Sequence, residues 1–185
     1  MEYICDREDI PIMKRSPGSL RESIRQTQPF ASRETEALLT LIWAQDRVLE
    51  RALEPLGPQE LSLAQYNVLR ILRGSPEGLE TRKVCDRLIT RAPNLTRLVD
   101  KLEAKGYLRR QRDRTDRRVI HLVITPEGLR HLGSLDRPMA AATKDAMSAL
   151  SDRELATLIR LLNRLAGPVT PGRSRKQSGT KETRT

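Results

Sequence analysis

The stretch NLTRLVDKLEAKGYLRRQRDRTDRRVIHLVITPEG, residues 94–128, decides the fold of this chain of 185 residues. In its first part, apolar residues recur at the i, i+3, i+4 and i+7 positions of an amphipathic helix, namely Leu95, Leu98, Val99 and Leu102. Gly106 is expected to end this helix, because glycine is favoured just past a helix C-terminus. The β-branched run that follows predicts a hairpin, with strands at residues 107–112 and 119–124 and an arginine-rich turn at residues 113–117.

Two more helices are predicted after the hairpin. Thr125 and Pro126 are typical of an N-cap and a first helical position, so a helix is expected to begin there and to run toward Leu150. Pro138 lies inside this helix, and we expect it to bend or break the helix because proline lacks an N–H. A last helix starts at the capping box of residues 151–154 and carries a narrow apolar stripe, formed by Leu155, Leu158, Ile159, Leu162 and Leu165.

Before the opening stretch, apolar periodicity predicts three helices. The residues ahead of them have few large apolar side chains at helical spacing and are expected to form a mostly loose arm, with room for a short helix around residues 20–26. The first of the three covers about residues 33–54, the second starts at a capping box of Ser62 with Gln65, and Thr81 caps the short third helix. The third helix is expected to have an inward face, formed by Val84, Cys85 and Leu88. The order of these elements predicts a mainly α fold with a small β-hairpin wing (α+β), in which a helix-turn-helix is followed by the wing.

The positive charge of the chain is concentrated in one segment. The formal net charge is +10, and residues 81–118 alone contribute +8, from 13 basic and 5 acidic side chains. By contrast, residues 34–80 sum to −4 and residues 119–166 to +1. Such an asymmetry is typical of a surface that faces a polyanion.

The predicted helix and hairpin carry the residues that we expect to contact DNA. A helix that enters the major groove needs an apolar face for docking and a polar face for base edges. The polar side and the N-terminal end of this helix are formed by Arg91, Asn94, Thr96, Arg97 and Lys101. Arginine suits the acceptors of guanine, asparagine suits adenine, and threonine suits phosphate. On the wing we expect contacts from Arg114, Arg117 and Arg118, while Asp116 holds an arginine in position through a charge-assisted pair.

Residues 81–128 resemble the winged helix-turn-helix of MarR-family transcriptional regulators, and the resemblance extends over about residues 34–165. The helix matches the family pattern at residues 96–108. The wing matches the family pattern at Arg110, Asp113, Asp116 and Arg118, followed by the ITPEG of residues 124–128. Two positions depart from the pattern, since Ile124 replaces the usual leucine and Pro138 interrupts a helix that is often continuous in the family.

The resemblance implies a homodimer that is built from the first and last helices and places one recognition helix of each subunit in the major groove. It also implies that Arg118 enters the minor groove with support from Asp116. The apolar stripes of the first and last helices need a partner surface. Within one chain they could pack only on each other, and the resemblance favours a bundle between two subunits instead. Many family members bind small aromatic or phenolic anions in a cleft, and the residues that could border such a cleft here are Trp43, Arg47 and Tyr66.

The expected organisation has a loose arm at residues 1–32, a MarR-like winged-helix domain at residues 33–166 and a disordered basic tail at residues 167–185. Within the domain, the winged helix-turn-helix occupies about residues 61–125, between dimerisation helices at about residues 33–54 and 126–166. We expect a sequence-specific regulator of double-stranded DNA, a homodimeric repressor on a pseudo-palindromic operator with a small ligand as candidate effector, in the cytoplasm and associated with the nucleoid. Two alternatives stay open, namely a redox-responsive regulator that uses Cys5 or Cys85 and a winged-helix adaptor that binds protein.

Other functional classes find no support in the residue pattern. Cys5 and Cys85 form neither a disulfide framework nor a metal-ligand spacing, and His121 and His131 have no clustered ligands beside them. Motifs for a nucleophile, a phosphate-binding loop or a catalytic zinc are lacking, so we expect neither an enzyme nor a cofactor. No apolar run approaches the roughly 20 residues of a membrane span, and the first thirty residues contain no signal-peptide core.

Overall fold

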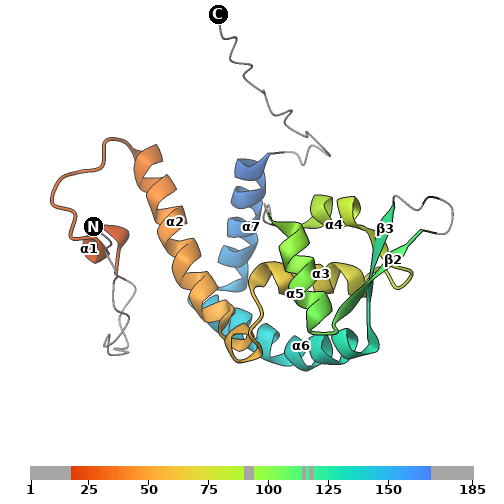
Figure 1. Ribbon diagram of the computed structural model, residues 1–185. Helices are drawn as coiled ribbons and strands as arrows, with labels where there is room; N and C mark the ends of the chain where they lie inside the picture. Colours follow the sequence, from red (N-terminus) through yellow and green to blue (C-terminus); the bar gives the residue numbers. More distant parts are fainter. Residues whose placement is uncertain (1–17, 90–93, 114–115, 117–118, 168–185) are drawn as a thin grey trace, which may run out of the picture. The chain divides into compact units, whose positions relative to one another are not determined.

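The computed structural model describes residues 18–89, 94–113, 116 and 119–167 of the chain (Figure 1). The chain divides into two compact units, Met1–Val48 and Leu49–Thr185. The helix α2 (Arg33–Ala52) begins in the first unit and ends in the second.

The described part of the first unit is helical. It contains the short helix α1 (Leu20–Ser23) and the greater part of α2. A capping box starts α1, because the Ser19 hydroxyl accepts the N–H of Glu22 and the Glu22 carboxylate accepts the N–H of Ser19. The helix predicted at about residues 33–54 is therefore confirmed, and α1 occupies part of the range 20–26 in which a short helix was left open.

The second unit follows the predicted order of elements, with a 3-10 helix and one short strand added. Its elements are η1 (Glu54–Gln59), α3 (Leu63–Arg73), β1 (Leu79–Glu80), α4 (Thr81–Arg87), α5 (Leu95–Ala104), β2 (Leu108–Arg112), β3 (Ile120–Ile124), α6 (Pro126–Ala146) and α7 (Asp152–Ala166). The capping boxes predicted at Ser62 and Ser151 are both present. Thr81, by contrast, does not cap α4: Glu80 occupies the N-cap, and the Thr81 hydroxyl donates to the carbonyl oxygen of Ile120 at 3.3 Å.

The strands form a three-stranded antiparallel sheet in the order β1-β3-β2. The predicted hairpin is confirmed, with Leu108 opposite Ile124 at its base and Arg112 opposite Ile120 next to its turn. The strand β1 was not predicted, because two residues are too few to show an alternating pattern. It pairs Leu79 with Leu122 and thereby fixes the start of α4 to the hairpin.

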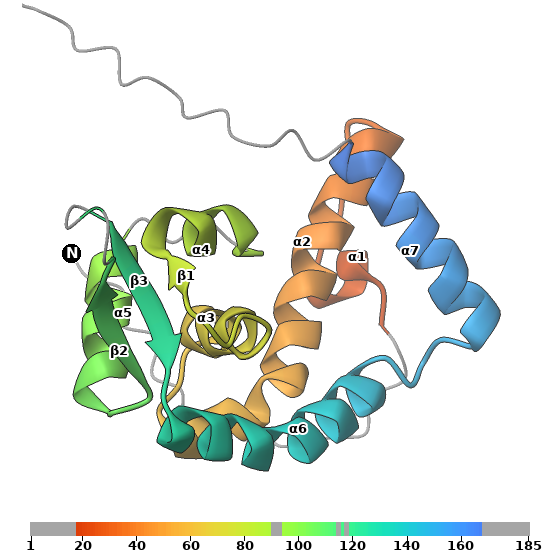
Figure 2. The same ribbon diagram turned by 90° about the vertical axis from the view of Figure 1, so that its right-hand side faces the viewer.

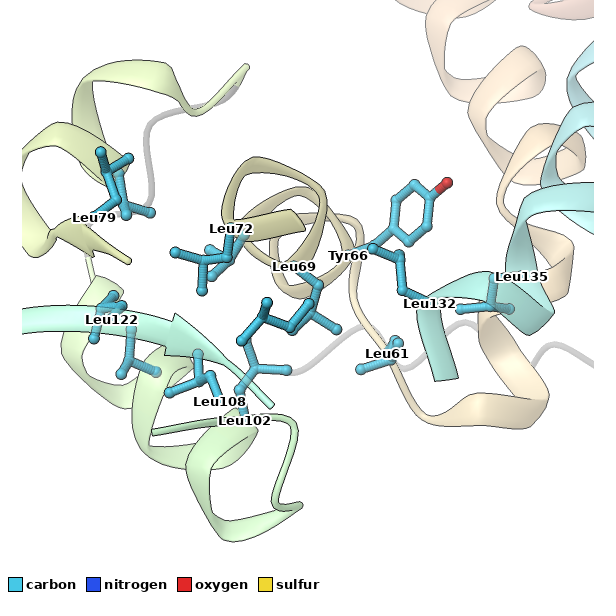
Figure 3. Close-up of a cluster of buried hydrophobic side chains, with 14 of the residues drawn as sticks. Leu61, Tyr66, Leu69, Leu72, Leu79, Leu102, Leu108, Leu122, Leu132 and Leu135 are labelled. Carbon is cyan, nitrogen blue, oxygen red and sulfur yellow. The ribbon is translucent and has the colours of Figure 1, made fainter. Parts of the chain in front are cut away.

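Leucines from several elements meet in one apolar core, which Figure 3 shows in close-up. The residues with almost no exposed surface include Leu69 and Leu72 of α3, Leu102 of α5, Leu108 and Leu122 of the hairpin, and Leu132 of α6. Burial of an apolar side chain of this size contributes about 1.5–3 kcal/mol to stability. Because α5 and the hairpin both contribute to this core, their outer faces are held in a fixed relation to each other.

The helix α6 starts as predicted and continues through Pro138. Thr125 is its N-cap and accepts the N–H of Gly128 at 3.0 Å, while Pro126 takes the first helical position. Pro138 was expected to bend or break the helix, and α6 is not broken there, since it continues from Pro126 to Ala146. Pro138 lies on the exposed side of the helix, where the carbonyl that loses its N–H partner is accessible to water.

Gly128 brings the start of α6 against the chain segment that leads into β2. A Cβ atom at this position would lie 2.1 Å from the carbonyl oxygen of Tyr107, a distance that no real Cβ contact reaches. The same carbonyl oxygen accepts the N–H of Thr125 at 3.0 Å. Only glycine therefore allows α6 to start at the base of the hairpin.

Candidate nucleic-acid interface

The helix α5 separates apolar from polar side chains as the sequence predicts. Its inner face is buried and consists of Leu95, Val99 and Leu102, with the partly buried Leu98 beside them. The predicted contact residues that the structure describes are all exposed, namely Asn94, Thr96, Arg97 and Lys101. Asn94 is the N-cap residue, but its side chain makes no capping hydrogen bond within the described residues.

Arg110 of β2 links the wing to α5. Its guanidinium forms ion pairs with Asp100, at 2.5 Å, and with Glu103, and both carboxylates belong to α5. The Glu103 carboxylate also accepts the backbone N–H of Arg110 at 3.0 Å. Burial by itself disfavours the charged form, yet these hydrogen bonds raise the pKa of Arg110 above its usual value. Arg110 is thus a charged bridge between the two elements, and Figure 2 shows α5 beside the hairpin.

The turn of the wing is organised by Asp113. Its Oδ1 atom accepts the backbone N–H of Asp116 at 3.0 Å, and its Oδ2 atom lies 3.2 Å from Nε2 of His121 on β3. Backbone hydrogen bonds close the turn, because Asp113 donates to the carbonyl of Val119 at 3.0 Å and Val119 donates to the carbonyl of Asp116 at 2.9 Å. The predicted supporting residue, Asp116, is exposed within this turn.

Four of the predicted contact residues lie outside the described residues, namely Arg91, Arg114, Arg117 and Arg118. The roles assigned to them, and the pairing of Asp116 with a wing arginine, therefore stay predictions. The residues that flank them are described on both sides, since β2 ends at Arg112 and β3 begins at Ile120.

Several functional candidates were missed from the sequence. The link from Arg110 to α5 could have been suspected, because Asp100, Glu103 and Arg110 are close in sequence and of opposite charge. Exposed arginines outside α5 were also not singled out, among them Arg82 on α4 and Arg112 on β2. They add positive charge to the elements next to α5 and the wing.

The side chain of Cys85 does not face the core as predicted. It was predicted to face inward on the third helix, but it is an exposed free cysteine. On α4 the buried position is Val84, with no exposed surface, and the next residue is turned about 100° away from it. Packing therefore gives no reason for the thiol. Cys5 lies outside the described residues.

The residues proposed for a ligand cleft belong to different units. In the first unit, the guanidinium of Arg47 lies 5.0 Å from the ring centre of Trp43, within the range of a cation–π contact. In the second unit, Tyr66 is buried in the core, and the guanidinium of Arg70 lies 5.8 Å from its ring centre. Both units thus carry an aromatic ring with an arginine over its face.

Over the described ranges, no group of three or more His, Cys, Asp or Glu residues could hold a metal ion. None of the helices in that part of the chain is both long enough and apolar enough to cross a membrane.

The sequence and the fold are similar to those of known transcriptional regulators. A model of the MarR family matches residues 59–119, from the end of η1 through the wing turn. The HTH-type transcriptional regulator TtmR of Methylorubrum extorquens (strain PA1) is 36% identical over 118 residues, which cover 60% of this chain and 60% of TtmR. The chain thus spans less than two thirds of that relative's length.

Two solved structures are similar over most of their own chains. The crystal structure of a MarR transcription factor from Planctomyces limnophilus is 38% identical, with a TM-score of 0.58, and the match covers 72% of this chain and 98% of that one. The PcaV transcriptional regulator from Streptomyces coelicolor, solved in complex with its natural ligand, is 27% identical with a TM-score of 0.61. That match covers 75% of this chain and 95% of PcaV.

Proposed function

The chain belongs to the MarR family of DNA-binding transcriptional regulators, and from this premise we propose that it is a homodimeric repressor of a pseudo-palindromic operator. One observation carries the proposal. The polar face of α5 is exposed, and Arg110 ties this helix to the strand that leads into the arginine-rich wing turn. Such a unit can present one element to the major groove and the other to the neighbouring minor groove. Acting on DNA would place the protein in the cytoplasm, with the nucleoid.

Within this proposal, each exposed residue of α5 has a distinct role. Asn94 and Arg97 contact base edges, since an amide can pair with adenine and a guanidinium with guanine. Thr96 donates to a phosphate at the start of the helix, where the backbone N–H groups also favour an anion. Lys101, one turn further along, contacts phosphate as a point charge. Arg91 joins Asn94 and Arg97 in the major groove.

The wing supplies the second set of contacts. Arg118 enters the minor groove, where a narrow groove concentrates negative potential. Arg114 and Arg117 contact the flanking phosphates. Asp116 orients Arg118 through a charge-assisted pair, which costs some positive charge but fixes the direction of the guanidinium.

Dimerisation is supported by apolar surface on the terminal helices. In the second unit, α7 has no buried residue among those described, and Ile159, Leu162 and Leu165 are 59%, 38% and 71% exposed. In the first unit, Leu38 and Ile42 of α2 are more than half exposed. Contiguous apolar surface of this kind marks an association site. A twofold dimer presents two α5 helices, which requires half-sites about one helical turn apart. A dimer bound across a promoter represses by occlusion.

A small aromatic or anionic ligand is the proposed effector. Trp43 with Arg47, and Tyr66 with Arg70, combine an aromatic face with a positive charge, which suits a ring that bears a negative group. PcaV, 27% identical to this chain, was solved with its natural ligand, and this supports a ligand-responsive regulator here. Release of DNA on ligand binding requires the ligand to prefer the conformation that binds DNA less tightly.

The proposal is tested by selection from a pool of duplexes with random central sequence. The wild-type chain should enrich duplexes that contain an inverted repeat, and the enriched duplex should compete for the protein far better than a scrambled one at the same salt concentration. A pool that stays random after repeated rounds, or equal competition by both duplexes, would contradict sequence-specific binding. Enrichment of a single half-site without a repeat would contradict the dimer.

A further inference from the structure

A histidine and an aspartate form an ion pair across the base of the wing turn. Nε2 of His121, on β3, lies 3.2 Å from Oδ2 of Asp113, which directly follows β2. The two side chains are only 27% and 29% exposed. Because the pair is partly shielded from water, salt screens it less than it screens a fully exposed ion pair.

The same carboxylate also holds the turn. Oδ1 of Asp113 accepts the N–H of Asp116 at 3.0 Å, and the backbone of Asp113 and Val119 closes the loop with a hydrogen bond of 3.0 Å. Asp113 therefore connects the side chain of His121 with the backbone of Asp116. A change in the strength of the pair between His121 and Asp113 reaches Asp116 through this one carboxylate.

We propose that His121 is a positioning residue of the wing, and that its protonation strengthens DNA binding. The inference rests on the proposed function, since it requires the wing to contact DNA. A neutral imidazole offers Asp113 one hydrogen bond, whereas an imidazolium offers a charge-assisted one. Protonation thus tightens the hold on the turn, and it adds positive charge next to a polyanion. Both effects favour the complex.

The strands on both sides of β3 place charged groups near His121. On β1, Glu80 is its cross-strand partner, and Lys83 of α4 is paired with Glu80. On β2, the cross-strand partner is the uncharged Gln111, which accepts a hydrogen bond from Arg109 at 3.1 Å. Glu80 and Asp113 thus place two carboxylates near the imidazole, while the cations Lys83 and Arg109 are engaged with other side chains.

The chain offers a matched control, because it contains two histidines in all. The second, His131, lies on α6 and stacks on Tyr107, with ring centres 4.4 Å apart. His121→Gln keeps a side-chain amide donor but cannot become charged. Asp113→Asn removes the charge of the partner and keeps an acceptor for the N–H of Asp116. His131→Gln removes the other imidazole of the chain.

The experiment measures the affinity of each full-length variant for the duplex enriched by the wild-type chain, by fluorescence anisotropy at constant ionic strength. Two pH values of about 6 and about 8 bracket the range in which imidazoles generally titrate. The wild type should bind about threefold more tightly at the lower pH, the usual effect of a partly exposed charged pair. His121→Gln and Asp113→Asn should lose this pH response, and His131→Gln should keep it.

Failure of this inference can be distinguished from failure of the proposed function. An identical pH response in the wild type and in His121→Gln overturns the inference, as does a response that disappears in His131→Gln. Circular dichroism checks the fold of each variant, and if His121→Gln does not fold, Asp113→Asn decides by the same criterion. A wild type that binds the duplex with a flat pH profile overturns this inference alone. A wild type that enriches no duplex overturns the proposed function and the inference with it.

Discussion

Arg110 and Glu103 are joined twice, once through their charged side chains and once through the backbone N–H of Arg110, which donates to Oε1 of Glu103 at 3.0 Å. The first residue belongs to the wing and the second to α5. With Asp100 as a second partner, the guanidinium neutralises two carboxylates on the helix that is proposed to meet DNA. Arg110 is therefore expected to act on DNA binding through α5 and not by direct contact.

Removal of this bridge should affect both stability and binding. In Arg110→Ala, the carboxylates of Asp100 and Glu103 lose their partner, which should lower the free energy of unfolding by about 1–2 kcal/mol. Their uncompensated charge should also weaken DNA binding by roughly tenfold, or about 1.4 kcal/mol. Urea denaturation and anisotropy titration measure the two effects.

Arg109→Ala is the matched control for that variant. Arg109 is the preceding residue of β2 and is exposed, and its guanidinium donates to Gln111 at 3.1 Å. Its removal should change the free energy of unfolding by less than about 0.5 kcal/mol. Equal losses of stability in the two variants would show that the pairing with α5 contributes nothing particular.

Lys101 is expected to contact phosphate without reading sequence. In Lys101→Ala, the slope of log K against log salt concentration should become shallower by about 0.9, because one fewer counterion is released on binding. The preference for the enriched duplex over a scrambled one should not change. Arg137→Ala, which removes an exposed charge on α6, should leave the slope as in the wild type. A slope that is equally steep in Lys101→Ala would place this residue off the DNA.

The stability of the fold should fall in mild acid because of His131. Burial, and then the positive charge of Lys105, lower the pKa of His131 below its usual value, while Glu127 opposes them. The unfolded chain therefore binds this proton more readily than the folded chain. The contribution of neutral His131 to the free energy of unfolding is fully present above the unfolded pKa of about 6.5. It decreases as the pH falls from there toward the lower pKa of His131 in the folded chain.

A ring substitution isolates this effect. His131→Phe keeps an aromatic ring to stack on Tyr107 and replaces Nε2, which is buried with no hydrogen-bond partner within the described residues. The free energy of unfolding, measured in urea at pH values of about 7.5 and 5.5, should depend less on pH in this variant than in the wild type. The same dependence in both proteins would refute the assignment to His131.

Dimerisation should depend on the apolar stripe of α7. Ile159→Glu places a charge on a side chain that is 59% exposed in the single chain, and it should weaken the dimer by at least about 1.5 kcal/mol per subunit. Thr157→Glu adds the same charge about 200° around the helix and should leave the dimer intact. Sedimentation equilibrium distinguishes the two. Unchanged association in Ile159→Glu would exclude this stripe from the interface.

The sequence predicted those elements whose residues signal their own conformation. Leu95, Val99 and Leu102 follow the helical period, and residues 120–124 are rich in β-branched residues, so α5 and the hairpin were located to within one or two residues. The capping boxes at Ser62 and Ser151 were equally clear, because their hydrogen bonds are local. The helical period of these apolar residues also predicted that the polar side of α5 is exposed.

Features that depend on distant contacts could not be predicted in this way. The strand β1 exists because Leu79 pairs with Leu122, some forty residues later in the chain. Cys85 was placed inward since helical spacing does not define which of two adjacent residues faces the core of a seven-residue helix. The pair of Asp113 with His121 requires the register of the hairpin, which the turn geometry determines. Pro138 shows that an exposed helix position tolerates the loss of one hydrogen bond.

If the exposed face of α5 reads DNA sequence, Arg97→Ala should lose part of the preference for the operator. The measurement is the ratio of affinities for the enriched duplex and for a scrambled duplex at one salt concentration, with Arg137→Ala as control. Loss of a base contact by Arg97 should cost about 1–3 kcal/mol of discrimination, which reduces this ratio by roughly 5- to 160-fold, while the control keeps the wild-type ratio. A wild-type ratio in Arg97→Ala would contradict the claim.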